Sequence, residues 1–267
     1  DMLDSGLIPA VELTDIFRQA RESDIVLNAH AINRGEMPKI SGKTGDYFFI
    51  PGGDNINDLV SGLAAQRLPK AYGVNPFEDI QILTPSRKRN GGTGNINRVM
   101  QAVLNPPAED KPQIVFNGIT FRLGDKVMQV RNNYDLEYTR DNGETDMGVF
   151  NGDIGKIVSV DKRNKVLKIK FDDKTYAYTA EFFNQIEHAW AITVHKSQGS
   201  EFNTVILCLN DTPKELQYRN LLYTAFTRAK KLLVVVGKYE ILEQMVKNDR
   251  KHLRYSGIKH FLQEYNG

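Results

Sequence analysis

The sequence predicts an α/β protein whose sheet is interrupted by a small antiparallel β-barrel. Up to about residue 105, and again after about residue 184, short apolar strands alternate with segments of helical periodicity, the pattern of a parallel sheet with crossover helices. Between them, from about residue 114 to 179, the chain changes to short strands separated by turn residues, which is typical of a small barrel.

The composition is that of an ordinary globular protein. The chain has 267 residues, of which 40% are hydrophobic and 25% charged, and its mean hydropathy is -0.43. The net charge of +2 neither requires nor excludes nucleic acid, because a local basic groove can lie on a nearly neutral protein. The single cysteine, Cys208, lies in an apolar run and excludes an internal disulfide. These properties fit a reducing compartment, and we expect a cytoplasmic protein.

Neither a membrane span nor a signal peptide is predicted. No apolar run reaches the roughly 18 to 20 residues that cross a bilayer, and the N-terminus has no basic region followed by an apolar one. Residue 1 is Asp1 rather than methionine, so we expect the chain to start inside a longer protein.

The first part of the α/β pattern predicts helices and strands in alternation. Ser23 is placed to cap a helix that runs to about Asn33, and a strand follows at residues 46–50. A second helix begins after Asn55, a second strand spans residues 79–83, and Asn95 is placed to cap a third helix.

The barrel region is predicted from about five short strands, among them residues 126–130, 156–160, 166–171 and 175–179. In residues 166–171 apolar side chains alternate with lysines, the period of a strand with one buried face. We therefore assign residues 1–110 and 184–267 to the α/β domain and residues 111–183 to the inserted barrel.

The α/β pattern resumes with the segment AWAITVHKSQGSEF (Ala189 to Phe202), which leads into a buried strand at residues 205–209. A helix is predicted at 220–228, a strand at 232–237 and a helix at 239–246. Hydroxyl, imidazole, ammonium and amide groups that are packed into seven residues beside strongly apolar neighbours need partners. A ligand with phosphate groups supplies them most simply.

The segment from Thr84 to Gly94 is a further candidate site. Thr84, Ser86 and Arg87 follow the strand at 79–83, and a glycine-rich loop comes next. Ligands bind at the carboxyl ends of strands in open α/β sheets. A solvated loop is the equally reasonable alternative for this segment alone.

These residues carry a resemblance to a known family. TVHKSQGSEF (Thr193 to Phe202) and YTAFTRAKKLLVVVG (Tyr223 to Gly237) are similar to motifs V and VI of superfamily-one helicases, most closely of the RecD-like, 5′-to-3′ branch. IFRQA (Ile16 to Ala20) resembles motif IV. GDKVMQVRNNY and VFNGDIG, which begin at Gly124 and Val149, are similar to the inserted SH3-like barrel of that family. Trp190 stands where the family commonly has tyrosine.

The resemblance implies that only half of a motor is present. Such helicases have two RecA-like domains, and the first carries a phosphate-binding P-loop and an acidic Mg²⁺-binding motif. No G-x-x-x-x-G-K-[ST] pattern occurs in this chain; residues 41–44, Ser-Gly-Lys-Thr, lack the earlier glycine. The chain therefore resembles the second RecA-like, P-loop NTPase-type domain with its barrel, and ATP and Mg²⁺ are expected only in the full-length protein, not in this chain alone.

The resemblance also implies roles for individual residues. Arg18 and Arg228 are expected to be arginine fingers on the γ-phosphate, since a guanidinium matches phosphate oxygens and stays charged. Gln19, Gly199 and Glu201 are expected to contact ATP. A cation at the end of a helix is the alternative for Arg228, and a structural carboxylate is the alternative for Glu201.

Single-stranded DNA is the second expected ligand. Its contacts are predicted to come from three places: Thr193, His195 and Lys196 in motif V; Thr84, Ser86 and Arg87; and Asn151 in the barrel. Hydroxyls and amides position a nucleic-acid backbone, and cations neutralise its phosphates. No resident metal site and no membrane contact are expected.

The partners implied are single-stranded DNA and the missing first RecA-like domain. Two alternatives remain open at this stage. One is a non-catalytic module whose barrel recruits a protein partner, and the other is an inactive accessory subunit that pairs with another motor.

Overall fold

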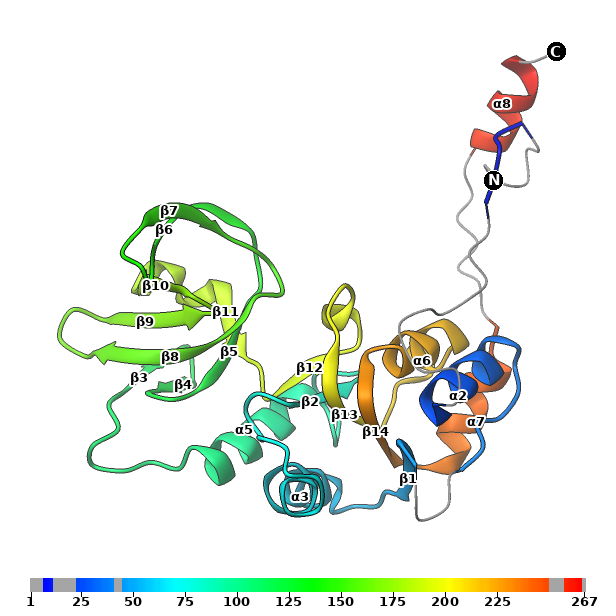
Figure 1. Cartoon of the computed structure of the whole chain (residues 1–267), viewed down its shortest axis with the longest axis horizontal. Coiled ribbons are helices and arrows are strands. Elements are labelled where there is room, and N and C mark those ends of the chain that lie inside the picture. The colour runs from blue at the N-terminus through cyan, green and yellow to red at the C-terminus, as the bar shows by residue number, and fades with distance from the viewer. Residues whose placement is uncertain (1–6, 12–22, 41–44, 250–256, 266–267) are drawn as a thin grey trace.

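The computed structural model describes residues 7–11, 23–40, 45–249 and 257–265. The chain forms two bodies that lie side by side, a parallel sheet with helices on both faces and a curled antiparallel sheet (Figure 1). The antiparallel sheet comes from the middle of the sequence, as predicted, so the parallel sheet is built from segments on either side of it.

The parallel sheet has five strands within the described residues, in the order β1-β14-β13-β2-β12. They are β1 (Tyr47–Pro51), β14 (Ala229–Gly237), β13 (Phe202–Leu209), β2 (Ile80–Thr84) and β12 (Ala191–Thr193). Every neighbouring pair is parallel. The carboxyl ends of β2 and β12 therefore lie at one edge of the sheet, and the candidate polar residues follow both strands there.

Two apolar cores cover the two faces of this sheet. The helices and turns that flank it are α2 (Asp24–Asn33), α3 (Ile56–Gly62), a π-helical segment (Leu63–Arg67), α4 (Leu68–Tyr72), α5 (Thr93–Leu104), α6 (Arg219–Phe226) and α7 (Tyr239–Lys247). Val205 and Leu207 of β13 share a core with α2, α6 and α7, whereas Ile206 and Cys208 share one with α3 and α5. Side chains alternate between the faces of a strand, so the continuous apolar run of β13 is explained by burial on both sides.

Helix α2 confirms a predicted helix but not its predicted cap. The Ser23 side chain makes no capping hydrogen bond to the helix; its hydroxyl donates to Asp46 over 2.5 Å. The same carboxylate accepts from the N–H of Ile25 over 3.2 Å. Asp46, which is distant in sequence, therefore satisfies the helix N-terminus that the local pattern assigned to Ser23.

Helix α5 begins before Asn95, the residue that was predicted to cap it. Its N-cap is Gly92 and it starts at Thr93, because carbonyls of the preceding loop accept its first N–H groups. The N–H of Thr93 donates to the Ser86 carbonyl over 3.1 Å, and that of Gly94 to the Arg87 carbonyl over 3.0 Å.

The antiparallel sheet has seven strands within the described residues, in the order β11-β5-β8-β9-β10-β6-β7. They are β5 (Lys126–Gln129), β6 (Asn133–Arg140), β7 (Thr145–Val149), β8 (Ile154–Asp161), β9 (Val166–Phe171), β10 (Lys174–Thr179) and β11 (Ile186–His188). The hairpin β3 (Gln113–Phe116) and β4 (Ile119–Arg122) lies beside it, and a 3₁₀ helix (Ala180–Gln185) leads into β11. The predicted alternation in β9 is confirmed, since Leu167, Ile169 and Phe171 are buried in the core of this sheet.

Strand β11 joins the two bodies. It pairs with β5 of the antiparallel sheet, and only two residues separate it from β12 of the parallel sheet. Buried Asp125 holds this junction, because its carboxylate accepts from Asn105 Nδ2 over 2.7 Å and from Gln101 Nε2 over 2.6 Å, and lies 3.2 Å from His188 Nε2.

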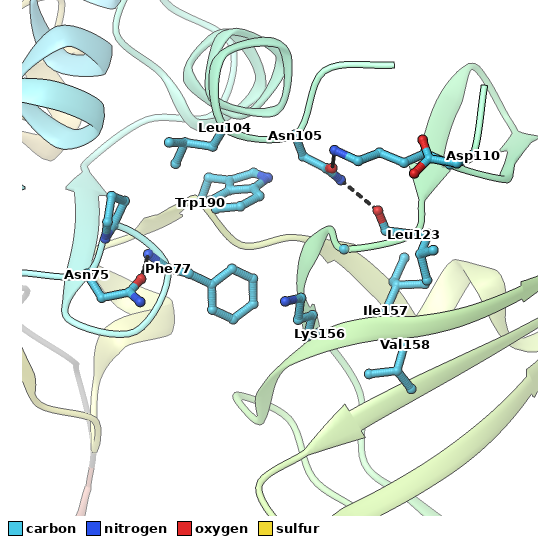
Figure 2. Close-up of a pocket in the computed structure, with 13 residues that line it drawn as sticks. Asn75, Phe77, Leu104, Asn105, Asp110, Leu123, Lys156, Ile157, Val158 and Trp190 are labelled. Carbon is cyan, nitrogen blue, oxygen red and sulfur yellow. Dashed lines mark hydrogen bonds between the residues drawn. The ribbon is translucent and has the colours of Figure 1, made fainter. Parts of the chain in front are cut away.

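A pocket of about 660 Å³ lies at the junction. Figure 2 shows the rings of Phe77 and Trp190 on its α/β side, with Lys156, Ile157 and Val158 of β8 on the opposite side. The two rings meet edge to face with centroids 5.5 Å apart.

Among the other described helical segments, a short 3₁₀ helix (Lys214–Leu216) precedes α6, and α8 (Ile258–Tyr265) follows α7. None of the helices in the described part of the chain combines the length and apolar character needed to cross a membrane. Residues 41–44, the Ser-Gly-Lys-Thr segment that lacks the earlier glycine of a P-loop, lie outside the described residues.

Candidate functional site

The segment between β12 and β13 forms a tight polar turn on an apolar anchor. Val194 is buried, and its carbonyl accepts a 2.7 Å hydrogen bond from the hydroxyl of Ser197, which closes a short 3₁₀ turn (His195–Ser197). The hydroxyl of Thr193 accepts from the N–H of Lys196 over 3.3 Å. His195 is left exposed and Lys196 half-buried, so the turn presents polar side chains outside the core.

Thr84 and Thr193 lie side by side. They are register partners on the parallel strands β2 and β12, and the Thr84 carbonyl accepts from the N–H of Val194 over 3.1 Å. Thr84 and Ser86 are both buried, and the Thr84 hydroxyl accepts from the N–H of Ser86 over 3.4 Å. Two segments predicted separately as DNA-contacting are thus adjacent, although Thr84 itself is covered.

Glu187 joins the two candidate cations of these segments. One carboxylate oxygen accepts from the guanidinium of Arg87, and the other lies 2.8 Å from the ammonium of Lys196. The side chain of Arg87 is 58% exposed, that of Glu187 35% and that of Lys196 24%. We call Arg87, Glu187 and Lys196 the Glu187 cluster.

The charges of this cluster decide the protonation state of its carboxylate. Burial raises the pKa of Glu187, but the hydrogen bonds and positive charges of Lys196 and Arg87 outweigh it and hold the pKa below its ordinary value. The carboxylate is therefore ionised at neutral pH, and the cluster carries a net charge of about +1.

His195 has a partner on another segment. Its Nε2 lies 3.1 Å from the hydroxyl of Tyr218, the residue that precedes α6. This contact connects the exposed side of the turn to the helix that carries the second motif.

The far end of the same segment meets Arg228. Gly199 has a φ of +87°, a conformation that favours glycine. A Cβ atom at this position would have no neighbouring atom within 4 Å. The Arg228 guanidinium donates to the main-chain oxygen of Ser200 over 2.9 Å, to that of Thr224 in α6 over 3.1 Å and to the Thr227 hydroxyl over 3.1 Å. The two predicted nucleotide-contacting segments are thus brought together.

Glu201 also has a cationic partner. Its carboxylate lies 3.3 Å from the ammonium of Lys230, which is at the start of β14. The ends of β13 and β14 that carry these residues are neighbours, since Phe202 pairs with Ala229.

Three predicted residues fall elsewhere. Asn151 lies on the turn between β7 and β8 of the antiparallel sheet, where its N–H donates to the Asn132 side chain over 2.9 Å. None of its hydrogen bonds among the described residues reaches the Glu187 cluster. Arg18 and Gln19 lie outside the described residues, so their predicted roles stay predictions.

The sequence reasoning missed Glu187, Tyr218 and Lys230. Glu187 had a usable signal, because it is a lone carboxylate directly before an apolar strand and motif V. Its partner Arg87 is 100 residues away, so no local pattern predicts the pairing. Among the described residues no group of three His, Cys, Asp or Glu side chains is arranged to hold a metal ion.

The fold and these two groups of residues define a class: a RecA-like α/β domain that carries an SH3-like antiparallel insertion. Family models match both parts. The SH3 domain of ATP-dependent RecD-like DNA helicases matches residues 96–171. The UvrD-like helicase C-terminal domain matches residues 188–236, which include all of Thr193 to Phe202 and all but the last residue of Tyr223 to Gly237.

Individual proteins are similar to this chain. The ATP-dependent RecD2 DNA helicase of Deinococcus radiodurans is 32% identical over 226 residues, which cover 83% of this chain and 28% of that protein. The RecBCD enzyme subunit RecD of Haemophilus influenzae is 28% identical over 190 residues, 71% of this chain and 26% of that one. A solved structure of Pif1 helicase from Bacteroides in complex with ADP-AlF3 and ssDNA covers 96% of this chain and 56% of that chain, at 18% identity and a TM-score of 0.48.

The predicted resemblance is confirmed: the chain is RecD-like, and its sequence corresponds to the C-terminal region of superfamily-one helicases of that kind. The chain spans about 28% of the length of the Deinococcus relative.

Proposed function

We propose that this chain is the C-terminal motor region of an ATP-dependent, 5′-to-3′ DNA helicase. The observation that carries the proposal is the path of one segment, Thr193 to Glu201. One end of it lies beside Thr84 and the Glu187 cluster, and the other end is hydrogen-bonded to Arg228. The name of the Deinococcus relative, an ATP-dependent DNA helicase, supports the same function; the polarity rests on family resemblance.

The DNA end of the segment is suited to a single strand. Arg87 and Lys196 supply cations for backbone phosphates, and Thr193 and His195 supply short polar groups that position the strand. Thr84 and Ser86 are buried, so we assign them to shaping the edge of the sheet under the strand. Asn151 is kept as a contact of the barrel with the strand, beside the exposed aromatic pair Tyr134 and Phe150.

The nucleotide end is suited to the γ-phosphate of ATP held mainly by a preceding P-loop domain. The guanidinium of Arg228 already binds three oxygen atoms, and phosphate oxygens are acceptors of the same kind but with more negative charge. Gly199 leaves open space at the turn, and Glu201 offers a carboxylate for a ribose hydroxyl. Arg18 and Gln19 are assigned to ATP on the resemblance alone. Mg²⁺ belongs to the acidic motif of the preceding domain in this proposal.

The two ends belong to one short segment. A phosphate drawn towards Arg228 competes with the main-chain oxygen of Ser200 and the hydroxyl of Thr227 for the guanidinium donors. Lys196 precedes Ser200 by four residues on the same backbone, which buried Val194 and Ser197 anchor. We propose that this segment couples nucleotide state to the hold on DNA. The assignment of residues 1–110 and 184–267 to a motor domain and 111–183 to the barrel belongs to the same proposal.

The test uses this chain joined to a P-loop domain of a RecD-like helicase. Arg228→Ala is expected to lower kcat for DNA-stimulated ATP hydrolysis by about 10³-fold or more, with a far smaller change in nucleotide affinity. The matched control is Arg163→Ala, an exposed arginine in the β8–β9 turn. Equal losses of kcat and nucleotide affinity in Arg228→Ala would contradict the finger role. The chain alone is expected to have negligible ATPase activity.

A second candidate is a subunit of a larger helicase assembly. It is favoured by the names of several relatives, which are RecBCD enzyme subunits. A DNA-unwinding assay of the longer protein distinguishes the two, because a self-sufficient motor unwinds DNA without a partner, whereas a subunit unwinds only when its partner is added.

A further inference from the structure

A cationic cleft opens beside the Glu187 cluster. It has a volume of about 570 Å³ and lies between the start of α5, the β3–β4 hairpin and β11. Three of the residues that line it are cations, Arg87, Lys88 and Arg98. Glu187 is the one carboxylate among the described residues that line it. A polyanion is the ligand that such a charge distribution favours.

The carboxylate of Glu187 is placed where a phosphate group of a polyanion would bind. Its two oxygens each hold a different cation, Arg87 from the β2 side and Lys196 from motif V. A carboxylate and a phosphate each present anionic acceptor oxygens in pairs, and both bind guanidinium and ammonium groups through charge-assisted hydrogen bonds. The two cations cannot give their strongest hydrogen bonds to a phosphate and to Glu187 at once.

We propose that Glu187 is an internal competitor that occupies the phosphate site between Arg87 and Lys196 until a DNA strand displaces it. The proposal rests on the proposed function, since it requires that these two cations bind DNA. It assigns to Glu187 the role of setting the affinity and the threshold for binding, rather than of contacting the strand.

The placement of Glu187 allows such displacement. The residue belongs to β11, which is held by β5 of the antiparallel sheet, opposite Met128. Its partners belong to the parallel sheet, Arg87 after β2 and Lys196 after β12. The antiparallel sheet therefore carries the carboxylate, through β11, and the parallel sheet carries the two cations, so a small movement of one sheet against the other separates them.

The energetics also allow it. Arg87 is more than half exposed, and ion pairs that are open to solvent are weak and are screened by salt. A DNA strand brings several phosphates into the cleft at once, and Lys88 and Arg98 add attraction that Glu187 does not oppose. An isolated small anion has no such advantage and is kept out by the carboxylate.

The test is binding of a fluorescent oligothymidylate to the purified chain, measured by anisotropy at several NaCl concentrations. Glu187→Gln removes the charge and keeps the shape, and we expect it to bind roughly three- to tenfold more tightly than the wild type. Glu243→Gln is the matched control, because Glu243 is also paired with a lysine, Lys247, but lies on α7. This control is expected to change the affinity less than twofold.

Double variants decide the mechanism. In the Arg87→Ala/Lys196→Ala background, the gain in DNA affinity from Glu187→Gln must disappear, because the two cations that Glu187 occupies are no longer present. A gain that persists there reflects bulk charge and overturns the proposal, as does equal or weaker binding by Glu187→Gln with an unchanged melting temperature. If Arg87→Ala and Lys196→Ala leave the affinity of the wild type unchanged, the proposed DNA site itself fails, which is a separate result.

Discussion

The guanidinium of Arg228 lies 2.9 Å from the main-chain oxygen of Ser200, so the last part of motif V is held against the end of α6. The same side chain donates to the carbonyl of Thr224 in the last turn of that helix. Arg228 is thus a cation at a helix C-terminus, the alternative expected from the sequence, and it is also hydrogen-bonded to the neighbouring segment. The two roles are compatible with a third towards phosphate.

These hydrogen bonds predict that the Arg228 side chain contributes modestly to the stability of the fold. Arg228→Ala should lower the free energy of unfolding by about 1 to 2 kcal/mol, because acceptor oxygens lose their donor but remain partly open to water. Urea unfolding followed by circular dichroism measures it, with Arg163→Ala as the exposed control. A loss beyond about 4 kcal/mol would mean that Arg228 is chiefly structural and would weaken its assignment to ATP.

The buried lysine at the junction predicts a pH dependence of stability. Lys126 donates to the carbonyls of Phe77 over 2.8 Å and Ile80 over 3.2 Å, and burial lowers its pKa from 10.5 to about 8. Below pH 8 the lysine is charged in both the folded and the unfolded state, so burial of the charged ammonium lowers the free energy of unfolding by its full amount. Between about pH 8 and 10.5 the unfolded state holds more protons, so the free energy of unfolding rises with pH.

The size of this effect follows from the shift. A pKa lowered from 10.5 to about 8 corresponds to about 3 kcal/mol. The wild type should gain that amount relative to Lys126→Met between pH 7.5 and 10.5, in parallel urea titrations. Comparison with the variant cancels the other groups that titrate in this range. A difference that stays constant with pH would show that Lys126 is not desolvated.

The position of Gly155 in the barrel has no room for a side chain. A Cβ at this position would lie 2.2 Å from the carbonyl oxygen of Lys170 on the neighbouring strand β9 and 2.5 Å from the Phe171 ring. Gly155→Ala should therefore destabilise the protein by about 2 to 4 kcal/mol, since backbone atoms cannot yield as a flexible side chain does.

Gly62→Ala is its control. Gly62 has helical φ and ψ and open space around it, so alanine should be neutral or stabilising by up to about 1 kcal/mol. Thermal unfolding of both variants makes the comparison. Similar stability of Gly155→Ala and the wild type would mean that strands β8 and β9 separate easily at this point.

Much of the fold followed from local patterns. Burial on both faces made the strand of Cys208 a continuous apolar run, and one-sided burial made β9 alternate, so both were predicted. Interactions that join distant segments were not predicted. Asp46, which caps α2, lies 22 residues after the first residue of that helix (24 to 46). Loop carbonyls accept the first N–H groups of α5, so this helix begins before Asn95.

The site shows the same division. Motif residues such as Thr193 and Lys196 were predicted because their residue types and order are distinctive. Glu187 was missed because its role depends on a sheet that brings it to Arg87, 100 residues away. The pairing of β11 with β5 depends in turn on Asp125 and His188, two polar residues whose contact crosses 63 positions.

The central claim is that this chain holds single-stranded DNA through the cations beside motif V. Its most direct test is the salt dependence of oligothymidylate binding by the wild type, Arg87→Ala and Lys196→Ala. Binding of the wild type should weaken steeply with salt, and each variant should bind more weakly and lower the slope of log K against log[salt] by about 0.7. Binding by the wild type that is absent or independent of salt would contradict the account.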